Sequence, residues 1–228
     1  METGKIDQFI RYVDSEILPA TEDLENLEVA SRKHVQKLVY TNLVDRFDSL
    51  IDGLVLDNCR CDYLTSEATK SMTQQITEAE LIQLLMRSGD IQEAIDEKLK
   101  ASIRNSVLRE RHSKKLVSAM TAFDVPSNFK SLPRVNISTG VILEKIKPQN
   151  NQVPYSIAGY SDWLYSRRNA IVHGNGTNKY LQNDLTQLKK LYKCVPPASF
   201  RIKLGTVQIA AEFYRGVCNL LLEGADEA

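Results

Sequence analysis

The sequence has little that would bind a metal ion or cross a membrane. It contains four cysteines and three histidines among 228 residues, and no two cysteines form a C-x-x-C pair. Zinc sites commonly use such pairs, so no metal site is expected and the cysteines should be free thiols. No stretch approaches the ~18 apolar residues that span a bilayer, and the first residues lack the apolar segment of a signal peptide. We therefore expect a cytoplasmic protein without membrane contact.

A net charge is absent as well. Lys+Arg and Asp+Glu both number 29, so the formal charge is zero. A global basic field for non-specific nucleic-acid binding is thereby excluded, and any contact with RNA must be local. The chain also lacks a G-x-x-x-x-G-K-[ST] phosphate loop and a carboxylate cluster at ligand spacing. A P-loop or metal-dependent phosphate-transfer enzyme is therefore disfavoured, and no cofactor is expected.

What the sequence does have is helical periodicity along most of its length. Hydrophobic residues make up 43% and charged residues 25%, as in soluble globular proteins, and no shift in composition divides residues 1–228 into separate domains. Apolar residues recur at three- and four-residue spacing, which is typical of amphipathic helices. The fold class is predicted to be all-α, a bundle with helices over 6–18, 27–56, 81–87, 91–111, 116–123, 161–173, 185–191 and 206–222.

Local signals set the expected ends of these helices. Pro19 should stop the first helix, Gly53 should loosen the second, and Thr77 with Glu80 forms a capping box before the third. Residues 57–76 are polar, and no helix is predicted there. Residues 124–159 are rich in proline and carry short β-leaning alternations, so they should form an irregular or small β-hairpin insertion. Residues 223–228 should fray.

One segment carries residues suited to catalysis. It lies in the motif helix expected over about 160–174, and its core reads Arg168-Asn169-Ala170-Ile171-Val172-His173-Gly174. An arginine separated from a histidine by four residues is common by chance. Three further features make the pattern more specific here. A polar residue follows the arginine directly, apolar residues lie between it and the histidine, and a glycine follows the histidine. The segment resembles the motif helix of the HEPN superfamily, over roughly residues 160 to 176; elsewhere the likeness is only architectural.

The resemblance implies both a fold and an activity. HEPN domains are helical and commonly dimerise with their motifs facing one another, and many cut RNA without metal in toxin–antitoxin, abortive-infection and other defence settings. By this resemblance the catalytic residues would be Arg168, Asn169 and His173, the substrate RNA, the assembly a homodimer, and a cognate antitoxin or defence-system protein a possible partner. The alternative is a non-catalytic HEPN module that binds nucleotide or another protein.

The residue types suit RNA cleavage for physical reasons. Attack by the 2′-hydroxyl needs a base, an acid for the departing 5′-oxygen and a cation for the charge that develops on phosphorus. Histidine can take or give the proton near neutral pH, while arginine stays charged and offers a planar fork to phosphate oxygens. His173 and Arg168 supply these two kinds of group.

Helix geometry places a constraint on the site. Five residues correspond to about 140° around a helix axis, so Arg168 and His173 of one chain should not converge on one phosphate. Asn169 and His173 share a face, and Asn169 can contact His173 or the phosphate. The site is more easily completed if the helix ends near Gly174 or if two chains pair about a two-fold axis.

Other residues near the motif have alternative interpretations. Arg167 and Lys179 are candidate substrate-binding residues, and with Lys189, Lys190 and Lys193 they can supply a local positive field. A solvated helix face is the plainer interpretation of the three later lysines. Arg168 can instead form a salt bridge, and His173 can simply favour the helix C-terminus. The apolar residues of the segment, Trp163, Leu164, Ile171 and Val172, should belong to the core or a dimer interface. His34 and His112 are assigned no role.

Overall fold

The computed structural model describes residues 1–72, 77–87, 91–145, 152–174, 178–197 and 202–227. These residues form an all-α fold, as predicted. The α-helices are α1 (Gly4–Tyr12), α2 (Leu18–Asp23), α3 (Val29–Asp57), α4 (Asp62–Ser71), α5 (Glu78–Arg87), α6 (Ile91–Asn105), α7 (His112–Ala122), α8 (Ser127–Ser131), α9 (Ile157–Gly174), α10 (Asn178–Tyr192) and α11 (Leu204–Glu227). No helix among the described residues is both long and apolar enough to cross a membrane.

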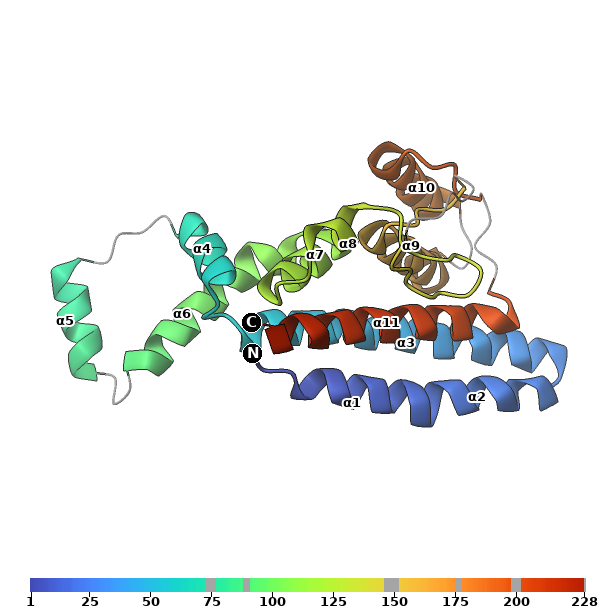
Figure 1. Ribbon diagram of the computed structural model, residues 1–228, viewed down its shortest axis with the longest axis horizontal. Helices are drawn as coiled ribbons and strands as arrows, with labels where there is room; N and C mark the ends of the chain where they lie inside the picture. Colours follow the sequence, from blue (N-terminus) through green and yellow to red (C-terminus); the bar gives the residue numbers. More distant parts are fainter. Residues whose placement is uncertain (73–76, 88–90, 146–151, 175–177, 198–201, 228) are drawn as a thin grey trace.

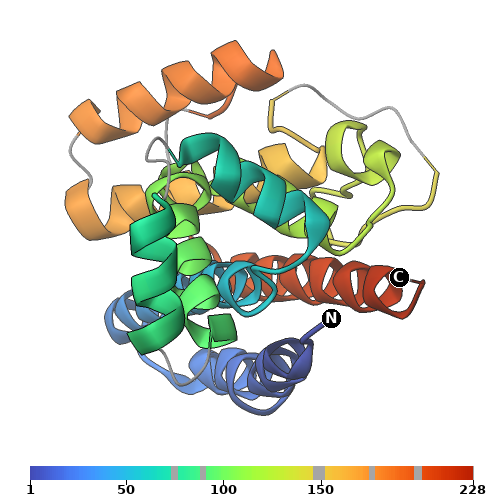
Figure 2. The ribbon, with the colours of Figure 1, turned by 90° about the vertical axis from the view of Figure 1, so that its left-hand side faces the viewer.

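The long helices form the base of the molecule. α1 and α2 run in one direction, while α3 and α11 run in the other, so both chain termini lie at one end of this bundle (Figure 1). α7 and α9 pack on α3 as a second layer, and α10 covers α9 from outside (Figure 2). α3 is therefore the central element, because it packs against α1, α7, α9 and α11.

The core is built on contacts between α3 and α11. The rings of Phe47 and Tyr214 stack with centroids 4.1 Å apart, and both side chains are fully buried. Large aromatic side chains contribute much of the apolar area that a core removes from water. Tyr40, also fully buried, donates a hydrogen bond from its hydroxyl to the Leu164 carbonyl oxygen at 2.8 Å. That bond fixes the position of α9 along α3.

The prediction that Pro19 ends the first helix was wrong. The chain stays helical to Asp23, through a π-helical segment at Val13–Ile17 and then α2, whose first turn contains Pro19. Proline is tolerated in the first turn of a helix because its fixed φ already suits the helical backbone. The wider π turn, in which the Leu18 N–H donates to the Val13 carbonyl, separates α1 from α2.

Three further expectations had different outcomes. The capping box is confirmed, since the Glu80 N–H donates to the Thr77 hydroxyl at 3.3 Å and the Thr77 N–H donates to the Glu80 carboxylate at 2.9 Å. The second helix was expected to loosen at Gly53, but α3 is continuous through it. The prediction that residues 57–76 form no helix was also wrong, because α4 occupies part of this range. Leu64 and Ala68 are the buried apolar residues of α4. Two such residues among polar neighbours are too few to reveal a helical period in the sequence.

The proline-rich insertion is largely irregular, as expected, with α8 at its start. Two isolated antiparallel bridges join Pro133 to Ser156 and Val135 to Ile142. The Asn136 N–H donates to the Val141 carbonyl at 2.9 Å, which makes a small hairpin-like turn. The motif helix begins at Ile157, three residues before the predicted start at about 160, so the insertion is shorter than 124–159.

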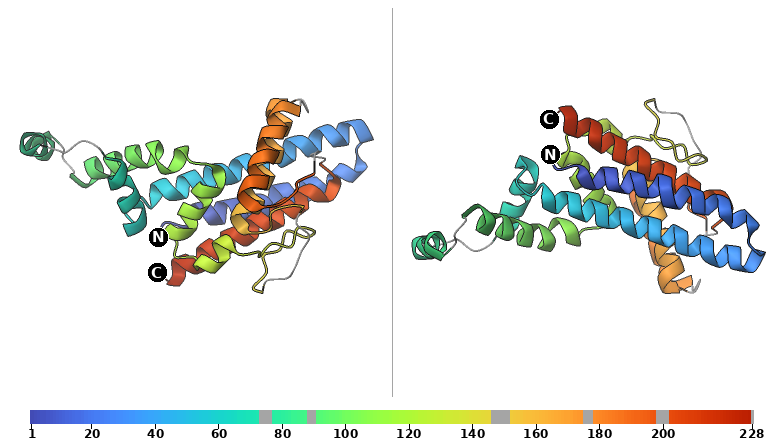
Figure 3. Two further views of the ribbon diagram at one scale, coloured as in Figure 1. Left: turned by 90° about the horizontal axis from the view of Figure 1, so that it is seen from above. Right: turned by 90° about the horizontal axis from the view of Figure 1, so that it is seen from below.

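α4, α5 and α6 form an arm that projects from one end of the bundle (Figures 1 and 3). Arg60 ties the arm to the body, with Nε 2.5 Å from Asp96 Oδ1 and Nη2 2.9 Å from Asp96 Oδ2. α5 lies farthest out and packs on α6. Its Met86 side chain is 82% exposed.

The C-terminal residues are helical to Glu227, so the predicted fraying does not occur over 223–227. α11 approaches the turn after α7 so closely that a Cβ on Gly224 would lie 2.0 Å from the Phe123 carbonyl oxygen. Only a glycine permits this approach. The packing of the last turn therefore depends on the absence of a side chain.

We expect Gly224→Ala to lower the free energy of unfolding by about 1–3 kcal/mol, because the backbone of α11 or of the turn must shift. Gly4→Ala is the matched control, since it is also a helical glycine but nothing lies within 4 Å of a Cβ there. Its effect should stay below about 1 kcal/mol and favour folding, following helix propensity. Urea denaturation of both variants measures the difference, and equal effects would contradict the close approach.

Candidate functional site

The motif helix α9 lies between the central helix α3 and the outer helix α10. Its first half is core. Trp163 and Leu164 are buried, as predicted, while Ile171 is partly buried and Val172 is 47% exposed. The helix therefore emerges from the core as it approaches the motif, which brings its last two turns toward the surface.

Arg168 is held by the central helix. Its Nε lies 2.6 Å from Oδ1 of Asp45 on α3, and Nη2 donates to Asp45 Oδ2 at 3.1 Å. The guanidinium also lies 5.9 Å from the ring centre of Tyr165. The ion pair with Asp45 and the one hydrogen bond from Nη2 hold the guanidinium against α3. The predicted alternative, a salt bridge at Arg168, is thus present in the structure.

Asn169 contacts Arg168 and an acidic residue of α10. Its Oδ1 accepts a hydrogen bond from Arg168 Nη1 at 3.1 Å, and its side chain interacts with the Asp184 carboxyl on α10. We expected Asn169 to contact His173 or a phosphate. Its described contacts link Arg168 to α10, and its contact with a phosphate stays a prediction.

His173 is exposed in the last turn of α9, and the helix ends at Gly174 as expected. The described contacts of Arg168 involve Asp45, Asn169 and Tyr165, so the structure does not bring Arg168 and His173 of one chain together. This agrees with their angular separation on a helix. Residues 175–177, which follow the motif, lie outside the described residues.

The basic residues near the motif have different surroundings. Arg167 is partly buried, with its guanidinium 5.5 Å from the ring centre of Tyr40 and 5.7 Å from that of Trp163. Lys189, Lys190 and Lys193 are exposed. Lys179 lies on α10, and its side chain is outside the part of the chain that the structure describes.

His112, to which the sequence assigned no role, lies in a buried polar network. Its Nδ1 is 2.6 Å from Asp48 Oδ1 on α3, and its Nε2 is 2.7 Å from Ser161 Oγ on α9. The ring also stacks on Tyr165, with centroids 4.6 Å apart. Carboxylate, imidazole and hydroxyl follow one another as in a hydrolase triad. Ser161 is fully buried, however, so its hydroxyl cannot meet a substrate and the network joins α3, α7 and α9.

A buried lysine completes this network. Lys115 Nζ lies 2.8 Å from Asp48 Oδ1 and 2.7 Å from Asp52 Oδ1. Burial would raise the pKa of the Asp48 carboxyl, but hydrogen bonds from His112 and Lys115 outweigh it and hold that pKa below its ordinary value. Likewise, burial would lower the pKa of Lys115, but its two carboxylate partners raise it. Both groups therefore stay charged inside the protein near neutral pH.

The sequence contained a signal for these contacts. Asp45, Asp48 and Asp52 are three and four residues apart on α3, so their carboxylates form one stripe on the helix. His112 and Lys115 have the same spacing on α7. An acidic stripe within an apolar helix can indicate buried cationic partners, but the partners lie more than sixty residues away along the chain.

Asp162 joins three helices by one carboxylate that is 2% exposed. Its Oδ2 lies 2.5 Å from Arg111 Nε and accepts a hydrogen bond from the Tyr192 hydroxyl at 2.8 Å. Its Oδ1 accepts from the Ser113 N–H at 3.0 Å, which caps the N-terminus of α7. Burial and the nearby carboxylate raise the pKa of Tyr192.

A polar cavity of about 290 Å³ opens beside this carboxylate. It lies between the N-terminus of α7, the middle of α9 and α10. The residues that line it are Leu108, Glu110, Arg111, His112, Lys115, Asp162, Tyr165, Ser166, Asn169 and Asp184. Because Asn169 is one of them, the cavity adjoins the motif.

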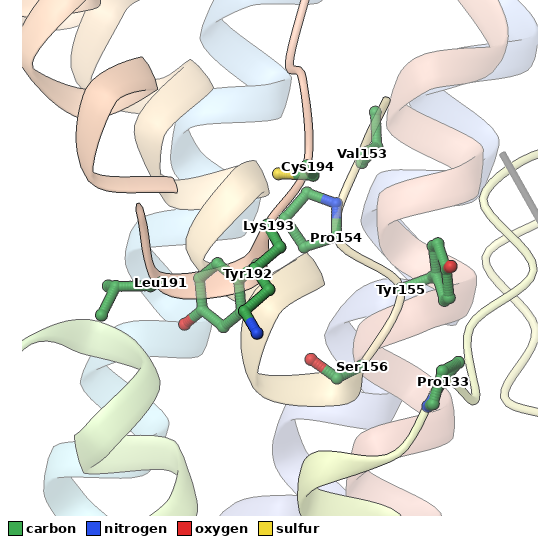
Figure 4. Close-up of a pocket in the computed structure, with 9 residues that line it drawn as sticks. All are labelled: Pro133, Val153, Pro154, Tyr155, Ser156, Leu191, Tyr192, Lys193 and Cys194. Atoms are coloured by element: carbon green, nitrogen blue, oxygen red, sulfur yellow. The ribbon is translucent and has the colours of Figure 1, made fainter. Parts of the chain in front are cut away.

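A second cavity, of about 280 Å³, lies between residues 153–156 and the end of α10 (Figure 4). Pro154 and Ser156 form one side, and Tyr192 and Cys194 form the other. The Tyr192 hydroxyl points away from Pro154 in this view. No residue of the motif lines this cavity.

The cysteines are free thiols, as expected. Within the described ranges, no three histidine, cysteine, aspartate or glutamate side chains lie together in a way that could hold a metal ion.

Comparisons with protein-family models, with curated proteins and with solved structures found no match to this chain. Support for a function therefore has to come from the residues and their geometry.

We expect Asp162→Asn to lower the free energy of unfolding by about 3 kcal/mol, because Arg111 loses its buried counter-charge and the new amide N–H groups face the Arg111 and Tyr192 donors. Asp57→Asn, which breaks the exposed pair with Lys5, is the control and should cost less than about 1 kcal/mol. Urea denaturation followed by circular dichroism gives both values. A loss at Asp162 no larger than at Asp57 would refute the joining role of this carboxylate.

Proposed function

We propose that this protein is a cytoplasmic, metal-independent endoribonuclease of HEPN type whose catalytic residues are Arg168 and His173, with Asn169 beside them. The observation that carries the proposal is how these side chains are held and exposed on α9. Arg168 is fixed by Asp45 and Asn169, and His173 is exposed at the end of the same helix. A pre-positioned cation and an exposed histidine are two kinds of group that phosphate cleavage requires.

The reaction would proceed by transfer of the phosphate to the 2′-hydroxyl. A base removes the hydroxyl proton, the 2′-oxygen attacks phosphorus, and the bond from phosphorus to the 5′-oxygen breaks as an acid protonates that oxygen. His173 supplies one of these proton transfers. The guanidinium of Arg168 stabilises the negative charge on the phosphate oxygens. The products are a 2′,3′-cyclic phosphate and a free 5′-hydroxyl.

The spacing of the two residues on α9 supports a homodimer with a composite site. Arg168 and His173 lie about 140° apart around the axis of α9, so a second copy is the simplest way to bring a histidine to each arginine. The exposed Val172 beside His173 would then lie at or near the contact. A toxin–antitoxin or antiphage defence role, with a cognate partner protein, is part of the same proposal.

The Arg168–Asp45 pair favours a second candidate. A guanidinium already bound to a carboxylate meets a phosphate only by sharing its remaining N–H groups or by leaving Asp45. If neither happens, the domain is a non-catalytic module that binds nucleotide or protein. The two candidates differ in whether RNA is cut.

In excess EDTA, the wild-type protein should cleave RNA and leave 2′,3′-cyclic phosphate ends. His173→Ala and Arg168→Ala should each reduce the rate by about 10²–10⁴-fold, because each removes a group that acts in the transition state. His34→Ala is the control, since His34 is also an exposed helical histidine and should leave the rate unchanged. Circular dichroism checks that each variant is folded. Cleavage that needs magnesium, or that survives both changes, rules the proposal out.

Mixing the two inactive variants tests the composite site. After subunits exchange in an equal mixture, half the dimers contain one chain of each kind, and each such dimer keeps one of two sites intact. Activity should therefore return to about a quarter of the wild-type value. Light scattering during gel filtration gives the mass of the assembly. A monomer with full activity, or a dimeric mixture that stays silent, would refute the composite site.

A further inference from the structure

The polar cavity beside Asp162 is lined by an acidic side chain, a basic side chain and apolar surface. Asp184 on α10 offers a carboxyl as an acceptor, and Arg111 before α7 offers a guanidinium as a donor. Leu108 and the Tyr165 ring add apolar surface. Small-molecule sites combine apolar walls with a few placed polar groups in this way. The volume, about 290 Å³, is at the lower end for ligand sites and suits one planar ring system.

The donor and the acceptor are both able to bind a ligand. Among the described residues, the Arg111 guanidinium donates one hydrogen bond, from Nε to Asp162, so its terminal nitrogens have no partner there. Burial raises the pKa of the Asp184 carboxyl, while Arg111 and the Asn169 and Ser166 side chains partly offset this. A half-buried carboxyl that is costly to desolvate gains from a ligand that donates hydrogen bonds to it.

The cavity is connected to the proposed catalytic residues through Asn169. This side chain lines the cavity and also accepts the hydrogen bond from Arg168. A ligand in the cavity therefore lies one side chain away from the guanidinium that would hold the phosphate.

We propose that this cavity binds a guanine base of the RNA strand next to the cleaved phosphate, with Asp184 accepting from the base and Arg111 donating to it. The inference rests on the ribonuclease function proposed above and gives it a substrate preference. Cleavage would then occur at phosphates adjoining guanosine.

Guanine is selected over other bases by the pattern of its edges. It carries two neighbouring donors, N1–H and the N2 amino group, which a carboxylate can accept together. It also carries two neighbouring acceptors, O6 and N7, which an arginine fork binds bidentately. Adenine would present its N1 lone pair to the carboxylate, and uracil would present carbonyls on both sides of its one donor. Cytosine offers an amino donor but lacks the N7 acceptor.

The direct test is binding of guanosine 5′-monophosphate, measured by isothermal titration in EDTA beside the adenosine, cytidine and uridine 5′-monophosphates. We expect guanosine monophosphate to bind at least about tenfold more tightly than the other three, as expected for a bidentate pair. Asp184→Asn, which keeps the size but removes the second acceptor oxygen, should abolish this preference. Gln187→Ala, an exposed change on the same helix, should leave it intact.

Mapping the 5′ ends of cleaved RNA separates this inference from the proposed function. If guanosine monophosphate binds selectively but RNA is not cleaved, guanine binding in the cavity is supported and the proposed ribonuclease function is overturned. If RNA is cleaved without preference for guanosine and the four nucleotides bind equally, guanine binding in the cavity is overturned. The proposed ribonuclease function is then unaffected. Because the four-nucleotide comparison uses the wild-type protein, it decides the matter even if Asp184→Asn fails to fold. A preference that persists in a folded Asp184→Asn variant also overturns the cavity.

Discussion

The carboxylate of Asp162 sits where α7, α9 and α10 meet, and the arrangement of these helices depends on it. A buried carboxylate is costly unless its oxygens are hydrogen-bonded and its charge is balanced. Here Ser113, Arg111 and Tyr192 satisfy both requirements from two different helices. The polar cavity and the position of Asn169 at its edge follow from that junction.

The stripe of carboxylates on α3 has a comparable effect on the motif itself. Asp48 and Asp52 hold cationic or polar groups of α7, and Asp45 holds Arg168 of α9. α3 is anchored in the core by its aromatic contacts with α11. The orientation of Arg168 is therefore set by the central helix of the protein. A guanidinium fixed in this way loses little freedom when it binds a phosphate, which is the condition that positioning catalysis requires.

The outcomes of the sequence predictions divide according to the distance between interacting groups. The capping box at Thr77 and Glu80 was found because its two partners are three residues apart. The cap of α7 was not found, because Asp162 lies forty-nine residues from Ser113. His112 was passed over for the same reason, since both of its partners belong to other helices. The error at Pro19 had another cause, a π turn that lets a new helix begin where proline is harmless.

The sequence by itself determined that the chain is helical, that Arg168, Asn169 and His173 share one helix, and that this helix ends at Gly174. These features depend on periodicity, caps and breakers, which act within about four residues. The tertiary structure alone decided that Arg168 pairs with Asp45, that His112 is buried, and that a polar cavity adjoins Asn169. Those contacts depend on the rotation and height of each helix against its neighbours, and the packing of the whole core sets both.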